Sequence, residues 1–220
     1  MDQLTTASWQ ALMLLFTGDP ALWEIVGISF SVSFRAIIIA TPFALVVGFI
    51  LAHTQFPGRR VLISTFNTLL ALPAVVVGLT VYMLLSRNGP LGDWKLLFTQ
   101  SAMIIGQIIL CFPLLVAISH SAFQAADRKV WETSITLGAK PWQAMLTLMH
   151  EVRFGLMAAV IAGFGRIIAE VGSSMMVGGN ILHYTRNIPT AIALGIVLLF
   201  AALLLNFSLS FIQGKGEMAQ

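Results

Sequence analysis

The sequence has few charged residues and a single cysteine. Charged side chains make up 10% of the 220 residues and hydrophobic ones 58%, whereas about a quarter of a typical soluble domain is charged. So few charges cannot cover a large water-exposed surface, which excludes an ordinary soluble domain. Cys111 has no second cysteine with which to pair, which excludes an intrachain disulfide framework and a CxxC metal site.

Other absences exclude further classes of protein. The basic residues are scattered and form no patch, so we expect no nucleic-acid partner. The four histidines show no HxxxH spacing, so we expect no metal site. No phosphate-binding GxxxxGK[ST] motif occurs, so ATP would have to bind another chain, and we predict no catalytic residue and no cofactor in this one.

Long apolar segments recur along the whole chain. An α-helix needs about 20 apolar residues to cross a bilayer, and this length predicts an all-α, polytopic transmembrane bundle. A shorter apolar segment at 4–17, followed by Gly18-Asp19-Pro20, predicts an interfacial helix. We therefore divide the chain into an N-terminal interfacial helix, a membrane domain and a tail, at 1–21, 22–212 and 213–220. The five predicted spans are 22–53, 61–86, 102–123, 154–177 and 188–212.

The distribution of basic residues predicts the orientation in the membrane. Lys and Arg are retained on the cytoplasmic side, and alternate loops carry seven and three of them. No basic residue precedes Arg35, so we expect no cleaved signal peptide, and the first span would direct insertion. With five spans the N-terminus is expected outside and the C-terminus in the cytoplasm. The loop 124–153 would then face the cytoplasm.

This loop is long enough to hold structure of its own. It predicts two short helices, because Asp127 can cap the first, Gly138 suits the left-handed residue after its end, and Pro141 suits the first turn of the second. Four apolar residues of the second helix have the spacing i, i+3, i+4 and i+7, which predicts one apolar stripe. These are Trp142, Met145, Leu146 and Met149.

The same loop resembles the EAA loop of ABC importer permeases, which reads Glu-Ala-Ala, three residues, Gly-Ala. In this chain it reads Glu132-Thr133-Ser134, then Gly138-Ala139 and Pro141-Trp142. The resemblance implies a helix seated in a cleft of a separate ATPase subunit, with these seven residues as the coupling residues. Thr133 and Ser134 replace the paired alanines, and His150-Glu151 replaces a common Leu-Pro, which suggests a subgroup of the family.

The fourth predicted span contains charged residues. Arg166 and Glu170 are spaced i and i+4, and a charge at this depth must face protein or water. The pair would either neutralise itself to fix helix packing or line a polar path with Ser173 and Ser174, where Arg166 could bind an oxyanion. Arg35, within the first span, is a second anion candidate and also an alternative partner of Glu170.

A second resemblance follows from the same span. Several motifs are similar to the permeases of molybdate and tungstate importers, above all those of the tungstate branch, and together with the EAA loop they cover most of 54–190. The motifs are Phe56-Pro57-Gly58-Arg59, Leu72-Pro73-Ala74-Val75-Val76-Val77-Gly78, Gly165-Arg166, Glu170-Val171-Gly172, Val177-Gly178-Gly179-Asn180-Ile181 and Thr185-Arg186-Asn187-Ile188-Pro189.

These resemblances imply the permease subunit of an importer for a tetrahedral oxyanion, with tungstate as the first expectation and molybdate or sulfate as alternatives. They further imply a homodimer in the inner (cytoplasmic) membrane, two ATP-binding subunits holding ATP and Mg, an external substrate-binding protein, and contact with membrane lipid. Two other classes compete with this interpretation. An ion-coupled secondary transporter would need acids within the membrane, of which only Glu170 is available, and a membrane enzyme would need clustered His, Asp or Cys.

Overall fold

The computed structural model describes residues 20–170 and, beyond them, only 196, 197, 200, 203, 204 and 207. All regular elements of these residues are helices, which confirms the predicted all-α class. The predicted interfacial helix 4–17, the tail 213–220 and most of the fifth span lie outside the described residues. The bounds of these three segments stay predictions.

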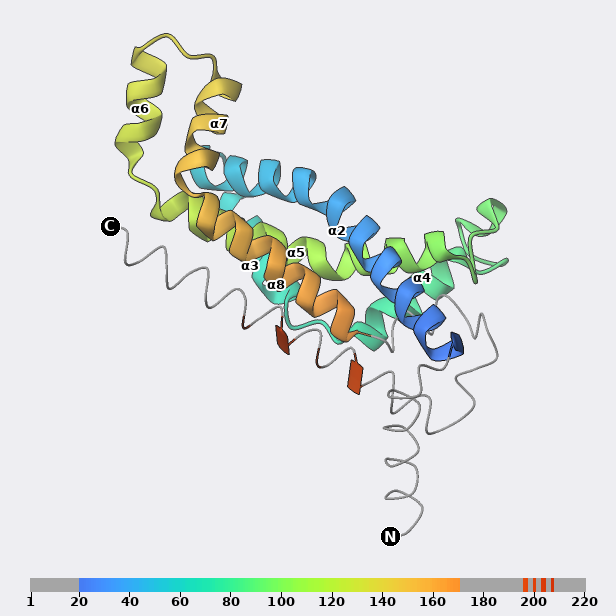
Figure 1. The fold of residues 1–220 in the computed structure, drawn as a ribbon. Coiled ribbons are helices and arrows are strands. Elements are labelled where there is room, and N and C mark those ends of the chain that lie inside the picture. Colours follow the sequence, from blue (N-terminus) through green and yellow to red (C-terminus); the bar gives the residue numbers. More distant parts are fainter. Residues whose placement is uncertain (1–19, 171–195, 198–199, 201–202, 205–206, 208–220) are drawn as a thin grey trace. The chain divides into compact units, whose positions relative to one another are not determined.

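Among the described residues, two helices are long and apolar enough to cross a membrane by themselves (Figure 1). They are α2, Pro20–His53, and α5, Gln100–Ala125. Both continue through an internal proline, Pro42 in α2 and Pro113 in α5. The spans predicted at 22–53 and 102–123 are therefore confirmed as helices, each slightly longer than predicted.

The single span predicted at 61–86 is wrong as a continuous helix. The structure has α3, Arg59–Leu69, and α4, Ala74–Leu85, bent by 102° relative to each other. Pro73 explains the break, because proline has no N–H and disfavours the helical conformation of the residue before it. Pro73 itself is extended, with φ −63° and ψ 132°, and it immediately precedes α4.

Helix α8, Arg153–Ala169, begins where the fourth span was predicted but ends earlier. Glu170 follows the last helical residue, and its N–H donates to the Ile167 oxygen in a turn. The prediction of one helix over 154–177 is therefore wrong at its C-terminal end. Residues 171–177 lie outside the described part of the chain.

The chain forms two compact units, each assembled from separate segments. The first unit comprises Met1–Ala36, Pro73–Leu110 and Phe164–Leu205. Inside it the Gln107 amide donates to the Ser33 hydroxyl at 3.1 Å, with both side chains buried. Its loop after α4 contains a short 3₁₀ helix, η1, Gly92–Trp94.

The second unit comprises Ile37–Leu72, Cys111–Gly163 and Asn206–Gln220. Its core contains Phe123, Leu148 and Leu156, which come from α5, α7 and α8 and are almost fully buried. Phe49 of α2 packs against this cluster. The predicted cytoplasmic loop 124–153 therefore lies entirely in the second unit, where its residues share a core with three longer helices.

Candidate functional site

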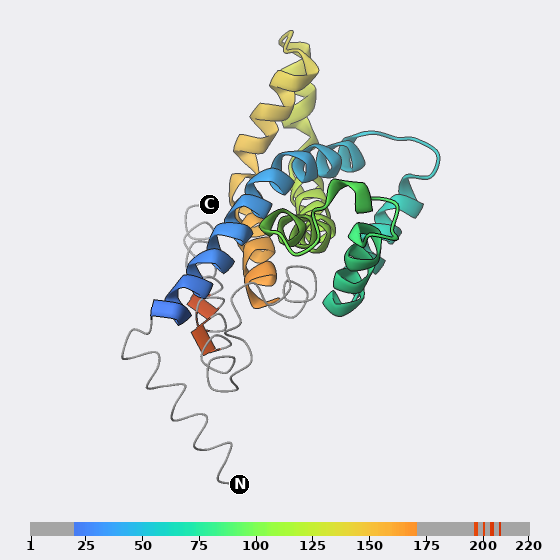
Figure 2. The ribbon, with the colours of Figure 1, turned by 90° about the vertical axis from the view of Figure 1, so that its right-hand side faces the viewer.

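The loop 124–153 folds into two short helices joined by a tight turn, as predicted. These are α6, Arg128–Thr136, and α7, Pro141–Glu151. They lie side by side and antiparallel in both views (Figure 1, Figure 2). We refer to this pair as the hairpin.

The ends of α6 follow local sequence signals. The Asp127 carboxylate accepts a hydrogen bond from the Lys129 N–H at 2.9 Å, which caps the first turn. After the helix, Gly138 has a φ of 88°, in the left-handed region that glycine tolerates. The N–H groups of Gly138 and Ala139 donate to the oxygens of Ile135 and Ser134. This is a Schellman ending, and it reverses the chain toward α7.

Helix α7 begins at the predicted residue. Pro141 occupies its first turn, where a missing N–H costs nothing. The Lys140 N–H donates to the side-chain oxygen of Gln143 at 2.8 Å, which satisfies the donor that precedes the helix. The turn between α6 and α7 is thus held by backbone–backbone hydrogen bonds at the end of α6 and by a backbone-to-side-chain hydrogen bond at the start of α7.

The predicted apolar stripe of α7 is only partly correct. The residues that α7 buries completely are Ala144 and Leu148, which the prediction did not include. Met145 and Met149 flank them and are partly buried. Trp142 and Leu146, in contrast, are 57% and 49% exposed. Successive residues of a helix are about 100° apart, so Trp142 and Leu146 lie on the side of α7 opposite Leu148. Leu148 packs in the core cluster of the second unit.

The predicted coupling residues lie together on the hairpin and are mostly exposed. Glu132 forms an exposed ion pair with Arg128, its neighbour one turn earlier, at 3.2 Å. Thr133 is exposed, whereas Ser134 is partly buried and donates its hydroxyl to the Val130 oxygen at 2.7 Å. We define the hairpin surface as the exposed residues Glu132, Ile135, Leu137, Trp142 and Leu146.

Trp131 connects α6 to the end of α2. Its ring centroid lies 5.4 Å from that of Phe49 and 5.4 Å from that of His53. Phe49 and His53 stack on each other at 4.7 Å, and Phe49 also meets Phe123 edge-on at 5.6 Å. This role of Trp131 could not be predicted from the sequence, because nothing local distinguishes Trp131 from the other tryptophans.

The predicted anion-path residues fall in the first unit or outside the described chain. Arg35 lies within α2 and its side chain is exposed, whereas Arg166 lies near the end of α8 and is partly buried. Glu170 follows the end of α8 and is also partly buried. Ser173 and Ser174 lie outside the described residues. The role of these five residues stays a prediction.

Comparisons with known proteins agree with this architecture. Residues 44–215 match the model of a family described as "Binding-protein-dependent transport system inner membrane component". The tungstate uptake system permease protein TupB of Campylobacter jejuni is 36% identical over 98% of this chain and 94% of its own length. The molybdenum transport system permease protein ModB of Escherichia coli is 30% identical over 79% of both chains. The sulfate transport system permease protein CysT of Escherichia coli is 28% identical over 97% of this chain and 84% of its own length.

Proposed function

The chain belongs to the family of inner membrane components of binding-protein-dependent transport systems, and we propose that it is the permease subunit of an ATP-driven importer for tungstate. Membership of this family makes it an inner membrane protein. The permease itself carries out no hydrolysis in this proposal. ATP and Mg bind to two separate cytoplasmic subunits, and an external binding protein delivers the anion to a permease homodimer.

The observation that carries the proposal is the hairpin. One side of it is anchored by Leu148 in the core and by Trp131 against α2, while the other side exposes apolar residues beside Glu132. An exposed apolar patch bordered by polar groups is typical of a protein interaction site. A rigid hairpin with one anchored and one exposed side can transmit a movement from a bound subunit to the membrane helices.

The hairpin surface therefore docks on the ATPase subunit. Glu132, Thr133, Ser134, Gly138, Ala139, Pro141 and Trp142 form or support the contact. Closure of the two ATPase subunits on ATP would draw the hairpins of the homodimer together, which closes the path on the cytoplasmic side and opens it to the outside. This direction requires the hairpin in the cytoplasm, with the N-terminus outside and the C-terminus inside, as the distribution of basic residues predicts.

The cargo follows from the relatives and from charge. Sequence identity falls from 36% to 30% and 28% across the tungstate, molybdate and sulfate permeases. All three ions are tetrahedral dianions, which require positive charge and hydrogen-bond donors along their path. Arg35 is exposed inside an apolar helix, and a charge there is unfavourable against lipid. We assign Arg35 and Arg166 to the anion path. Glu170, Ser173 and Ser174, which follow Arg166 in the sequence, are assigned to the same path.

Molybdate is the second candidate cargo, because the molybdenum permease is similar over 79% of this chain. The permease meets almost the same shape and charge in either ion. Discrimination between them is better made by the external protein, whose donors can enclose the anion completely.

The test is uptake by the complex reconstituted in liposomes with its ATPase and binding protein. Tungstate should accumulate only with internal ATP, and excess unlabelled tungstate should compete better than molybdate or sulfate. Co-purification of an ATPase subunit separates an ATP-driven importer from an ion-coupled transporter. Uptake that continues without ATP and follows an ion gradient would overturn the proposal.

A further inference from the structure

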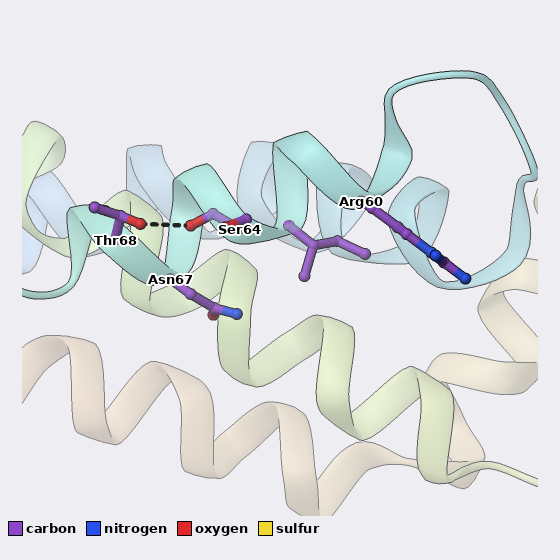
Figure 3. A pocket seen from close by; sticks show the side chains of 5 residues that line it. Arg60, Ser64, Asn67 and Thr68 are labelled. Atoms are coloured by element: carbon purple, nitrogen blue, oxygen red, sulfur yellow. Dashed lines mark hydrogen bonds between the residues drawn. The ribbon is translucent and has the colours of Figure 1, made fainter.

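Helix α3 carries a polar stripe along one side. Arg60, Ser64, Asn67 and Thr68 have the spacing i, i+4, i+7 and i+8, which places them on one face of a helix. Figure 3 shows these four side chains following one another along α3. Together with Ile63 they line an open groove of about 430 Å³. The groove lies wholly within the second unit.

The stripe is exposed although α3 belongs to a membrane segment. None of the residues of α3 is buried, and α3 and α4 together are apolar enough to form a broken span or a re-entrant loop. Polar and charged side chains inside a membrane face protein or a water-filled cavity, because lipid cannot hydrogen-bond to them. The polar side of α3 therefore faces a water-filled path or protein rather than lipid, while residues such as Leu62 and Phe66 occupy its other side.

The groove offers hydrogen-bond donors and one positive charge. The Thr68 hydroxyl donates a hydrogen bond to the Ser64 backbone oxygen at 2.9 Å. For the side chains of Arg60, Ser64 and Asn67 the described residues provide no hydrogen-bond partner. The five lining residues include no acid and one guanidinium, whose planar fork of donors matches an oxyanion. The groove is open along one face of α3, so an anion bound in it would keep part of its water shell.

We propose that this groove binds the tetrahedral oxyanion during its passage, with Arg60 as the positive charge and Ser64 and Asn67 as the donors. The inference rests on the proposed function and deepens it, because it adds a binding site in the second unit to Arg35 and Arg166 in the first. By the predicted orientation Arg60 lies toward the cytoplasm, which makes the groove a site on the exit side of the path.

Thiol labelling tests whether the stripe faces water. Cys111 is the only cysteine of the chain and is fully buried, so a membrane-impermeant thiol reagent should scarcely label the unmodified permease. In the complete reconstituted complex, Ser64→Cys and Asn67→Cys should become labelled, and tungstate should slow their labelling. Leu62→Cys, on the opposite side of α3, is the matched control and should stay unlabelled. Equal labelling at all three positions, or labelling that tungstate leaves unchanged, would overturn the proposal.

Uptake tests whether the donors act on the cargo. Removing a hydrogen bond to a charged group costs about 1.5–3 kcal/mol, so the double variant Ser64→Ala with Asn67→Leu should lower the tungstate uptake rate about tenfold or more. The ATPase should still co-purify, because neither residue lies on the hairpin. Thr65→Val should stay near the wild type, since Thr65 lies on the same helix outside this groove and its hydroxyl donates to the Val61 backbone oxygen at 2.9 Å.

Two outcomes identify the cause of a failure. If the wild-type complex transports tungstate and the double variant does so equally well, the groove is not a cargo site and the proposed function stands. If the wild-type complex transports none of the three oxyanions, the proposed function itself fails. Anionic phospholipid headgroups share the net negative charge and the phosphate oxygens of the cargo, so uptake is measured in zwitterionic and in anionic liposomes. A loss confined to anionic liposomes would assign the groove to lipid and overturn the cargo site.

Discussion

The indole of Trp131 lies between α6 and the end of α2, 5.4 Å from the imidazole of His53. Because His53 is the last residue of α2 and stacks on Phe49 of the same helix, we expect a movement of α6 to be passed to α2. The Schellman turn and the core residue Leu148 hold the rest of the hairpin in place.

Trp131→Ala should therefore uncouple ATP hydrolysis from transport. Aromatic pairs contribute about 0.5–1.5 kcal/mol each, so loss of the contacts to Phe49 and His53 should lower the stability of the detergent-solubilised permease by about 1–3 kcal/mol. The complex should hydrolyse ATP while importing fewer anions per ATP. The measurement is the ratio of tungstate uptake to phosphate release, together with a thermal unfolding curve.

Trp142→Ala is the matched control, because Trp142 is a tryptophan of the same hairpin with its side chain 57% exposed. It should leave the unfolding temperature unchanged and weaken co-purification of the ATPase instead. An unchanged uptake ratio in Trp131→Ala, or the same defect in both variants, would contradict the assignment of separate anchoring and docking sides.

The turn at Gly138 should tolerate substitution according to backbone conformation alone. A Cβ atom at Gly138 would meet nothing within 4 Å, but its φ of 88° disfavours other residues. The left-handed conformation costs L-residues about 1–2 kcal/mol, and asparagine adopts it more readily than most. Gly138→Asn should therefore retain most uptake and Gly138→Val should lose much of it, as measured beside the unfolding temperature of each variant. Equal uptake by the two variants would show that the turn does not depend on this conformation.

The structure also shows which features could be predicted from the sequence and which could not. The roles of Asp127 as a helix cap, of Gly138 in the turn and of Pro141 in the first turn of α7 were predicted correctly, because capping and turn formation depend on a few neighbouring residues. The break at Pro73 was missed, since the apolar residues on both sides satisfy the length of a span and the sequence alone does not distinguish a kink from a sharp bend. The contact of Trp131 with His53 depends on the packing of helices that are distant in the sequence, which no local pattern encodes.

The close approach of α2 and α5 at Gly48 should be sensitive to a single methyl group. A Cβ atom at Gly48 would lie 3.0 Å from the Ser119 Cβ and 3.1 Å from the backbone nitrogen of His120. Overpacking costs about 1–3 kcal/mol, so Gly48→Ala should lower the unfolding temperature of the permease and its yield in the membrane.

Gly106→Ala is the control for Gly48→Ala, because Gly106 lies in α5 and a Cβ atom there would meet nothing within 4 Å. Alanine favours a helix over glycine, so Gly106→Ala should leave the unfolding temperature unchanged or raise it. A lower unfolding temperature for Gly106→Ala than for Gly48→Ala would contradict the close packing at Gly48.

Substitutions in the ion pair of Glu132 with Arg128 can distinguish a role in binding the ATPase from a role in the stability of the hairpin. Both side chains are exposed, 61% for Glu132 and 86% for Arg128, and exposed pairs contribute little to folding because water and salt screen them. Glu132→Gln and Arg128→Gln should therefore both leave the unfolding temperature of the permease unchanged. If Glu132 serves the ATPase rather than the hairpin, only Glu132→Gln should weaken co-purification and uptake, whereas Arg128→Gln should keep both near wild type. Equal losses in the two variants would mean that the pair matters as a unit, and that Glu132 is not itself the docking residue.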